Sequence, residues 1–123
     1  MPGIRVTTLR IAGGAYVCSV AGELDADSAE TLREELMAVA DQGGRHVIAD
    51  LVDVPFLDSA ALELLLTTSE RLKLGGGELV VVCDDPRTLR VFDVTGSGHH
   101  FRIERSLAHA VDELAGRTFV GHD

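Results

Sequence analysis

The sequence predicts a single α/β domain in which helices pack against a mixed, mostly parallel β-sheet. Two short, nearly continuous apolar runs, 47–51 and 79–83, are typical of strands covered on both faces. A leucine-rich helical segment separates them, and two strands joined by a helix form a right-handed parallel crossover. The other segments complete the order ββαβαβαβα, so we expect one domain, 1–123, with a core of about 4–115 and a short C-terminal tail, 116–123.

The first third of the chain predicts a β-hairpin followed by a helix. Apolar residues occupy near-alternate positions in 4–11 and again in 16–21, and paired glycines between them supply the positive φ angles of a tight turn. From 29 to 40 the apolar residues recur at helical spacing, opposite a largely charged side. Candidate caps precede this helix and glycines end it: Asp25, Asp27, Ser28, Gly43 and Gly44.

The rest of the chain continues this alternation. Asp58 and Ser59 open the leucine-rich helix at 60–74, which three glycines at 75–77 end. Three further elements follow the strand at 79–83: a short helix that ends at Gly96, an edge strand around 101–103 and an amphipathic helix at 107–114.

The composition excludes several classes of function. The chain carries 20 acidic and 11 basic residues, a formal net charge of −9, whereas nucleic-acid binding needs a basic stripe. No apolar stretch approaches the roughly 18 residues that span a bilayer, and residues 1–10 lack the plan of a signal peptide, so we expect a cytoplasmic protein without membrane contact. Cys18 and Cys83 lie inside apolar strand-like runs, where we expect reduced, buried thiols. A protein partner or a small ligand remains.

The sequence contains no complete catalytic, metal or cofactor site. The glycines at 75–77 precede Glu78, which would repel a phosphate, so they fit a helix end better than a phosphate loop. Ser59 is flanked by Asp58 and Ala60 instead of the glycines of a nucleophile elbow. The candidate metal ligands His99, His100 and His109 have no carboxylate or cysteine pair at ligand spacing nearby. We therefore expect no enzyme activity, no metal and no cofactor.

Aspartates follow two of the predicted strands. Asp25 comes after the second strand, and Asp50, Asp53 and Asp58 bracket the connection after the third. Sites in parallel α/β sheets form at the edge where strands lead into helices, so Asp25 and Asp58 would share one edge. On general grounds, helix capping and loop solubility are the stronger explanation of these aspartates. A phospho-acceptor receiver domain is disfavoured by the order of elements and by the lack of a lysine after the last strands.

Ser59 is the residue that position alone singles out. In the first turn of a helix, free amide groups and the positive end of the helix dipole favour an added phosphate by roughly 0.3–1 kcal/mol. Serine at a helix start is also an ordinary capping residue, so a phosphorylation switch and a structural cap are both open. The apolar side of the following helix is wider than one core-facing stripe requires, which suggests that part of it faces a partner.

Several motifs together resemble the STAS domain, the family of bacterial anti-sigma factor antagonists. The segment 50–62, DLVDVPFLDSAAL, is similar to the family signature, and Gly22-Glu23-Leu24-Asp25 is similar to its strand-end motif. The helix-to-strand turn at 75–79 and the segment 90–96 resemble further family motifs, in the same order along nearly the whole chain.

The resemblance implies a partner-switching protein. In its unphosphorylated form it would bind an anti-sigma factor, itself a serine kinase, and so free a sigma factor for transcription. The phosphorylated serine would be Ser59, with the kinase supplying ATP and metal, and the resemblance leaves room for a phosphatase that resets the switch. The implied partner-binding residues are Asp25, Asp58, Ser59, Ala60 and Ala61.

One departure from the family pattern and several alternative functions stay open at this point. The family commonly has a small polar residue and then glycine after the serine, and Ala60-Ala61 in their place bears on which kinase docks. The same fold also serves as a module of anion transporters, a subunit of lipid-transport systems, a stress-signalling scaffold and a small-ligand sensor. A transporter module would adjoin a membrane segment, which this sequence does not contain.

Overall fold

In the computed structural model, which describes the backbone of residues 3–120, five strands form one sheet in the spatial order β1-β2-β3-β4-β5. β1 and β2 pair antiparallel, and each later pair is parallel. The predicted mixed, mostly parallel sheet is confirmed. The strands are β1 (Arg5–Ile11), β2 (Ala15–Ala21), β3 (His46–Asp53), β4 (Glu78–Val82) and β5 (Arg102–Glu104).

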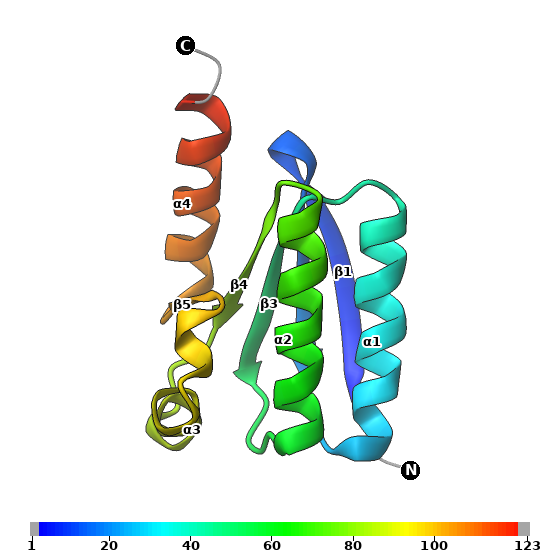
Figure 1. Cartoon of the computed structure of the whole chain (residues 1–123), viewed down its shortest axis with the longest axis vertical. Coiled ribbons are helices and arrows are strands. Elements are labelled where there is room, and N and C mark those ends of the chain that lie inside the picture. The colour runs from blue at the N-terminus through cyan, green and yellow to red at the C-terminus, as the bar shows by residue number, and fades with distance from the viewer. Residues whose placement is uncertain (1–2, 121–123) are drawn as a thin grey trace.

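Helices cover both faces of the sheet (Figure 1). The helices α1 (Ala26–Asp41), α2 (Ser59–Leu74) and α3 (Pro86–Thr95) lie on one face, and α4 (Leu107–Val120) packs on the other. The predicted order ββαβαβαβα is confirmed, with two short 3₁₀ turns, η1 (Ala12–Gly14) and η2 (Ser97–His99), added to it. α4 extends to Val120, into the segment 116–123 expected as a tail, and 121–123 lie outside the described residues. None of the described helices is long and apolar enough to cross a bilayer.

The alternation of side chains along β3 accounts for two separate cores. Val47, Ala49 and Leu51 pack with the leucines of α1 and α2, whereas Ile48 packs against Ala110 and Leu114 of α4. Successive side chains of a strand point to opposite faces, so a central strand between two helical layers has to be apolar at nearly every position. This is why the sequence shows an apolar run here instead of an alternating pattern.

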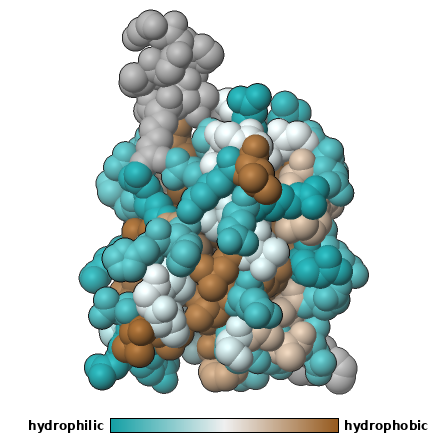
Figure 2. Space-filling view, viewed as in Figure 1, coloured by the Kyte–Doolittle hydropathy of each residue, from teal (hydrophilic) through white to brown (hydrophobic). Residues whose placement is uncertain are grey.

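The leucines of α2 fill the main core, which corrects the expectation that part of its wide apolar side faces a partner. Leu62, Leu64 and Leu65 are 9%, 7% and 0% exposed, and the partly buried Leu66 packs against the same core. α2 lies beside α1 over the sheet (Figure 1), and its buried leucines belong to the cluster that both helices form with the strands. Hydrophobic side chains are visible between α2 and α3, while hydrophilic residues cover most of this face (Figure 2).

The glycines at 75–77 reverse the chain, as predicted, where α2 ends. Gly75 is the C-cap, and a Cβ atom on Gly77 would lie 1.7 Å from the carbonyl oxygen of Arg45. The amide of Glu78 then donates to that same carbonyl at 3.1 Å and so starts β4 beside β3. The close backbone approach explains glycine at position 77 without any phosphate.

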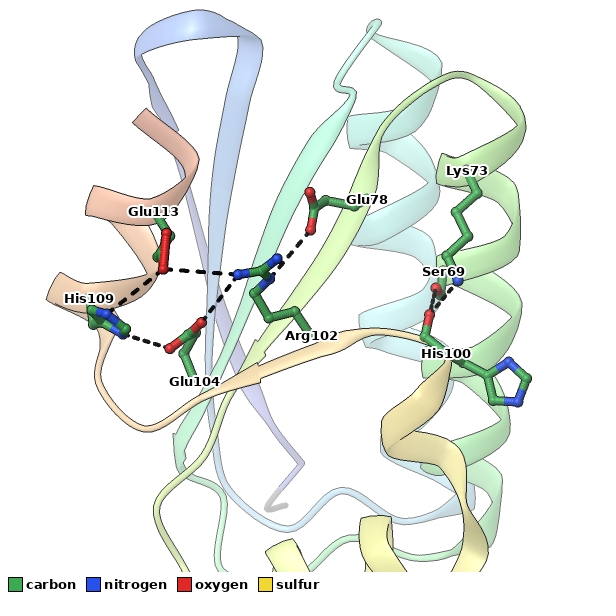
Figure 3. A network of polar contacts seen from close by, with 8 residues as sticks. All are labelled: Ser69, Lys73, Glu78, His100, Arg102, Glu104, His109 and Glu113. Carbon is green, nitrogen blue, oxygen red and sulfur yellow. Dashed lines mark hydrogen bonds and ion pairs between the residues drawn. The ribbon is translucent and has the colours of Figure 1, made fainter. Parts of the chain in front are cut away.

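A polar network joins β5 to α4 and β4 (Figure 3). The Arg102 guanidinium lies between the carboxylates of Glu78, Glu104 and Glu113 at N–O distances of 3.9–4.0 Å. His109 Nδ1 is 2.6 Å from Glu104 Oε1. The side chains of these pairs range from 12% exposed at Glu104 to 60% at His109, and ion pairs near the surface contribute about 0–1 kcal/mol each.

The candidate ligands His99, His100 and His109 do not form a metal-binding group. His99 ends the η2 turn, and the carbonyl of His100 accepts hydrogen bonds from the Ser69 hydroxyl and the Lys73 ammonium of α2, each at 2.6 Å (Figure 3). His109 contacts Glu104 in the network described above. The part of the chain described by the structure contains no group of three or more metal-ligating side chains.

Candidate functional site

Two helices begin side by side at the edge where β2 and β3 end. Leu24 and Leu57, which follow these strands, form an isolated parallel bridge. The Leu24 amide donates to the Phe56 carbonyl at 3.0 Å, and the Asp58 amide donates to the Leu24 carbonyl at 3.2 Å. The residue after each leucine is a helix N-cap, Asp25 for α1 and Asp58 for α2. The prediction that Asp25 and Asp58 share one edge is confirmed.

The start of α1 is fastened by a reciprocal cap. Asp25 Oδ1 accepts from the Ser28 amide at 2.9 Å, and the Asp25 amide donates to Ser28 Oγ at 2.9 Å. The Ser28 hydroxyl also donates to the Glu23 carbonyl at 2.8 Å. Hydrogen bonds from the backbone amide and then the hydroxyl of Ser28 hold the pKa of Asp25 below its ordinary value, because they favour the ionised carboxylate.

The start of α2 has a simpler cap and carries the candidate phosphorylation site. Asp58 Oδ1 accepts from the Ala61 amide at 3.1 Å, and Ala61 has no hydroxyl with which to return a bond. Ser59 is the first helical residue and its side chain is exposed. Within residues 3–120, its hydroxyl makes no hydrogen bond. The oxygen that would receive a phosphate therefore lies free at the surface, next to first-turn amides and the positive end of the helix dipole.

The structure brings the five predicted contact residues together but not all to the surface. Asp25, Asp58 and Ala60 are half-buried, and Ser59 is exposed. Ala61 is 0% exposed and belongs to the main core, because its position in the first turn of α2 points at the sheet. The methyl group that stands where the family commonly has glycine thus has no surface to offer a partner. Of the other two aspartates, Asp53 is exposed, and half-buried Asp50 accepts from the Val52 amide at 3.2 Å.

The edge that surrounds Ser59 is strongly acidic. The three helices on this face all begin with an aspartate N-cap, since Asp85 caps α3 as Asp25 and Asp58 cap α1 and α2. Arg87 pairs with Asp85 at 3.3 Å and lowers the pKa of that carboxyl. Acidic residues in these loops and first turns are Glu23, Asp25, Asp27, Asp53, Asp58, Asp84 and Asp85. Such an edge favours a cationic partner surface over an anionic ligand.

The same edge holds an open cleft and an exposed aromatic side chain. The cleft has a volume of about 690 Å³ and is lined by residues 52–55 and 84–87. Phe56, directly after this lining segment, is 52% exposed, although Val54 and Leu57 on either side are buried. No sequence pattern singles out Phe56, because apolar residues in a loop show no periodicity from which exposure can be predicted.

A five-stranded mixed sheet of this kind, with helix starts gathered at one edge, is an architecture shared with solved anti-sigma factor antagonists. A crystal structure of such an antagonist from Mycobacterium paratuberculosis aligns with a TM-score of 0.82 and 31% identity, covering 90% of this chain and 93% of that chain. The structure of SpoIIAA in its phosphorylated form aligns with a TM-score of 0.71 over 89% of this chain and 99% of that chain, and at 22% identity it supports the fold alone.

The chain belongs to the STAS domain family, whose model matches residues 7–110. The resemblance drawn from the sequence motifs is therefore confirmed. Among the curated relatives, the anti-sigma-B factor antagonist of Bacillus subtilis is 40% identical over 78 residues, 63% of this chain and 71% of the relative. The protein of the same name from Staphylococcus aureus is 32% identical over 81 residues, 66% of this chain and 75% of the relative.

Proposed function

We propose that this chain is an anti-sigma factor antagonist controlled by phosphorylation of Ser59. In its unphosphorylated form it binds an anti-sigma factor that is a serine kinase, and a sigma factor is released. It acts in the cytoplasm, where transcription is regulated, and works by binding, without catalysis or a cofactor of its own. The names of the relatives support the antagonist role. The observation that supports the switch is the free Ser59 hydroxyl at the start of α2, directly after the Asp58 cap and next to the loop that carries Asp25.

The charge of a phosphate explains how the switch would work. A phosphoserine adds roughly −1.5 to −2 charge at neutral pH. An interface that closes over Ser59 would have to desolvate this charge beside the Asp58 carboxylate, which is costly unless the partner pairs it. The first-turn amides and the helix dipole tolerate an anion, so the domain itself keeps its fold. Phosphorylation therefore acts on the complex and leaves the free domain nearly unchanged.

The test uses a purified anti-sigma factor from the organism that encodes this chain, with ATP. We expect the intact mass of the wild type to rise by one phosphate, the affinity to fall after phosphorylation, and Ser59→Ala to bind without gaining mass. Ser106→Ala is the matched control, because Ser106 also lies at a helix start, where its Oγ accepts from the His109 amide at 3.1 Å. Phosphate gained by Ser59→Ala, or equal affinity of the phosphorylated and unmodified wild type, would overturn the switch.

A further inference from the structure

Phe56 combines exposure with an aromatic ring in the loop that leads to the acidic edge. Among the described residues, the large apolar side chains that are exposed also include Leu9, Val52, Leu74, Val91 and Val94, and Phe56 is the aromatic member of this set. The ring is 52% exposed three residues before Ser59. Aromatic side chains bury a large area with few rotatable bonds, which is why they are frequent among the residues that dominate binding energy.

Backbone pairing holds the Phe56 ring outside the core. The Phe56 carbonyl accepts from the Leu24 amide at 3.0 Å, the next residue forms the Leu24–Leu57 bridge, and the Asp53 carbonyl accepts from the Gly22 amide at 3.2 Å. Val54 and Leu57 already occupy the core on either side, at 4% and 8% exposure. This pairing fixes the backbone on both sides of Phe56, so a partner meets the ring on an ordered loop and little backbone ordering is required on binding.

The charges around Phe56 select the kind of partner. Carboxylates of Asp53 and Asp58 flank it in sequence, and Asp25 lies across the parallel bridge. A second copy of this chain, with net charge −9, would bring the same acidic edge against itself. A surface that buries the ring therefore needs basic groups around an apolar pocket, because like charges brought face to face in an interface cost affinity.

We propose that Phe56 is the apolar anchor of the partner interface, inserted into an apolar pocket of the anti-sigma factor that is rimmed by lysine or arginine side chains. The inference rests on the proposed function. It adds two things to that function. One is the residue of this chain that supplies most of the contact, and the other is the chemistry of the partner surface. Ser59 then sits at the border of the anchored contact, where a phosphate would oppose its closure.

The test compares the wild type, Phe56→Ala and Leu74→Ala against the purified anti-sigma factor kinase. Leu74 is the matched control, because it is 90% exposed at the opposite end of α2. Removing Phe56 should weaken binding by at least about tenfold and raise KM for phosphorylation of Ser59 with kcat nearly unchanged. Leu74→Ala should behave like the wild type, and Phe56→Leu should recover part of the affinity. Binding of the wild type should also weaken as the salt concentration rises.

Several results would refute the proposal that Phe56 is the anchor. If Phe56→Ala bound as tightly as the wild type, the ring would not be the anchor. If binding did not change with the salt concentration, the partner pocket would not have a basic rim. A wild type that dimerises in sedimentation experiments, with Phe56→Ala monomeric, would identify a second copy as the occupant instead. A wild type that neither binds the kinase nor accepts phosphate would refute the proposed function, an outcome distinct from failure of the anchor alone. Melting curves of the variants show whether any loss reflects unfolding.

Discussion

Asp25 and Asp58 occupy equivalent positions in two loops that the Leu24–Leu57 bridge holds together, and each caps a helix of 16 residues. The two caps differ three residues further on. The Ser28 hydroxyl accepts a hydrogen bond from the Asp25 amide, whereas Ala61 has no side-chain acceptor and the Asp58 amide donates to the Leu24 carbonyl instead. Reciprocal hydrogen bonds between Asp25 and Ser28 therefore hold the start of α1, whereas the Asp58 side chain holds the start of α2 through its bond to the Ala61 amide.

Replacing Ser28 by alanine should destabilise the fold. The substitution leaves the Asp25 amide and the Glu23 carbonyl without their partner in a region where Ser28 is 7% exposed. Such losses cost about 1–3 kcal/mol. Urea denaturation measures the change, with the exposed Thr31→Ala in the same helix as the control. Equal stability of both variants would contradict the role assigned to the reciprocal cap.

Stability should decline in acid through Asp25. Its pKa is lower in the folded protein than in the unfolded chain, because Ser28 favours the ionised form. The contribution is therefore fully present above the ordinary pKa of 3.8 and is lost as the pH falls through the lower folded value. Melting temperatures of the wild type and Asp25→Asn, measured from pH 7 downward, should converge in acid. Curves that stay parallel would count against this linkage.

Gly77→Ala should be strongly destabilising, in contrast to Gly75→Ala. A Cβ at position 77 meets the Arg45 carbonyl oxygen at 1.7 Å, whereas a Cβ at position 75 has its nearest neighbour, the Leu72 carbonyl oxygen, at 3.6 Å. Forcing atoms into a packed site costs about 1–3 kcal/mol. Gly75→Ala should be neutral or slightly stabilising, since its φ of −91° suits alanine. Denaturant titrations of both variants measure the change in unfolding free energy, and similar losses of stability at the two positions would refute the prediction.

Both cysteines should behave as inert core residues. Cys18 and Cys83 are free and buried, and burial raises the pKa of each thiol. A thiol reagent at neutral pH should therefore react only when the domain is unfolded by denaturant. The double variant Cys18→Ala, Cys83→Ala should keep partner binding. Loss of binding with a normal melting curve would reveal a role beyond packing.

Ser59→Asp should leave the fold nearly unchanged. A carboxylate in the first turn gains from the helix dipole by about 0.3–1 kcal/mol, and the neighbouring Asp58 offsets part of this gain. Urea denaturation should therefore place the variant within about 1 kcal/mol of the wild type. A larger loss would mean that charge at this position disturbs the domain itself, contrary to a switch that acts on the complex.

Much of this fold is predictable from local patterns, and the remainder depends on contacts distant in sequence. The α2 helix is predicted by the spacing of its leucines, and its end at Gly75 is predicted by the run of three glycines. The burial of the α2 leucines cannot be predicted locally, because it depends on the packing of α2 against α1 and the sheet, which lie far away in the sequence. The shared edge of Asp25 and Asp58 follows from parallel topology, whereas the exposure of Phe56 depends on a bridge between residues 24 and 57 that no periodicity reveals.

The Leu24–Leu57 bridge joins its two loops through main-chain atoms and buried leucines. Among the described residues, the side chains that a partner would meet, at positions 25–27 and 58–60, make no hydrogen bond across the two loops, because the capping aspartates bond within their own helices. Substitutions at Ala26, Asp27, Ser59 and Ala60 can accordingly accumulate without loss of the scaffold. Duplicated copies of such a domain within one cell can diverge in the partners they recognise while every copy continues to fold in the same way.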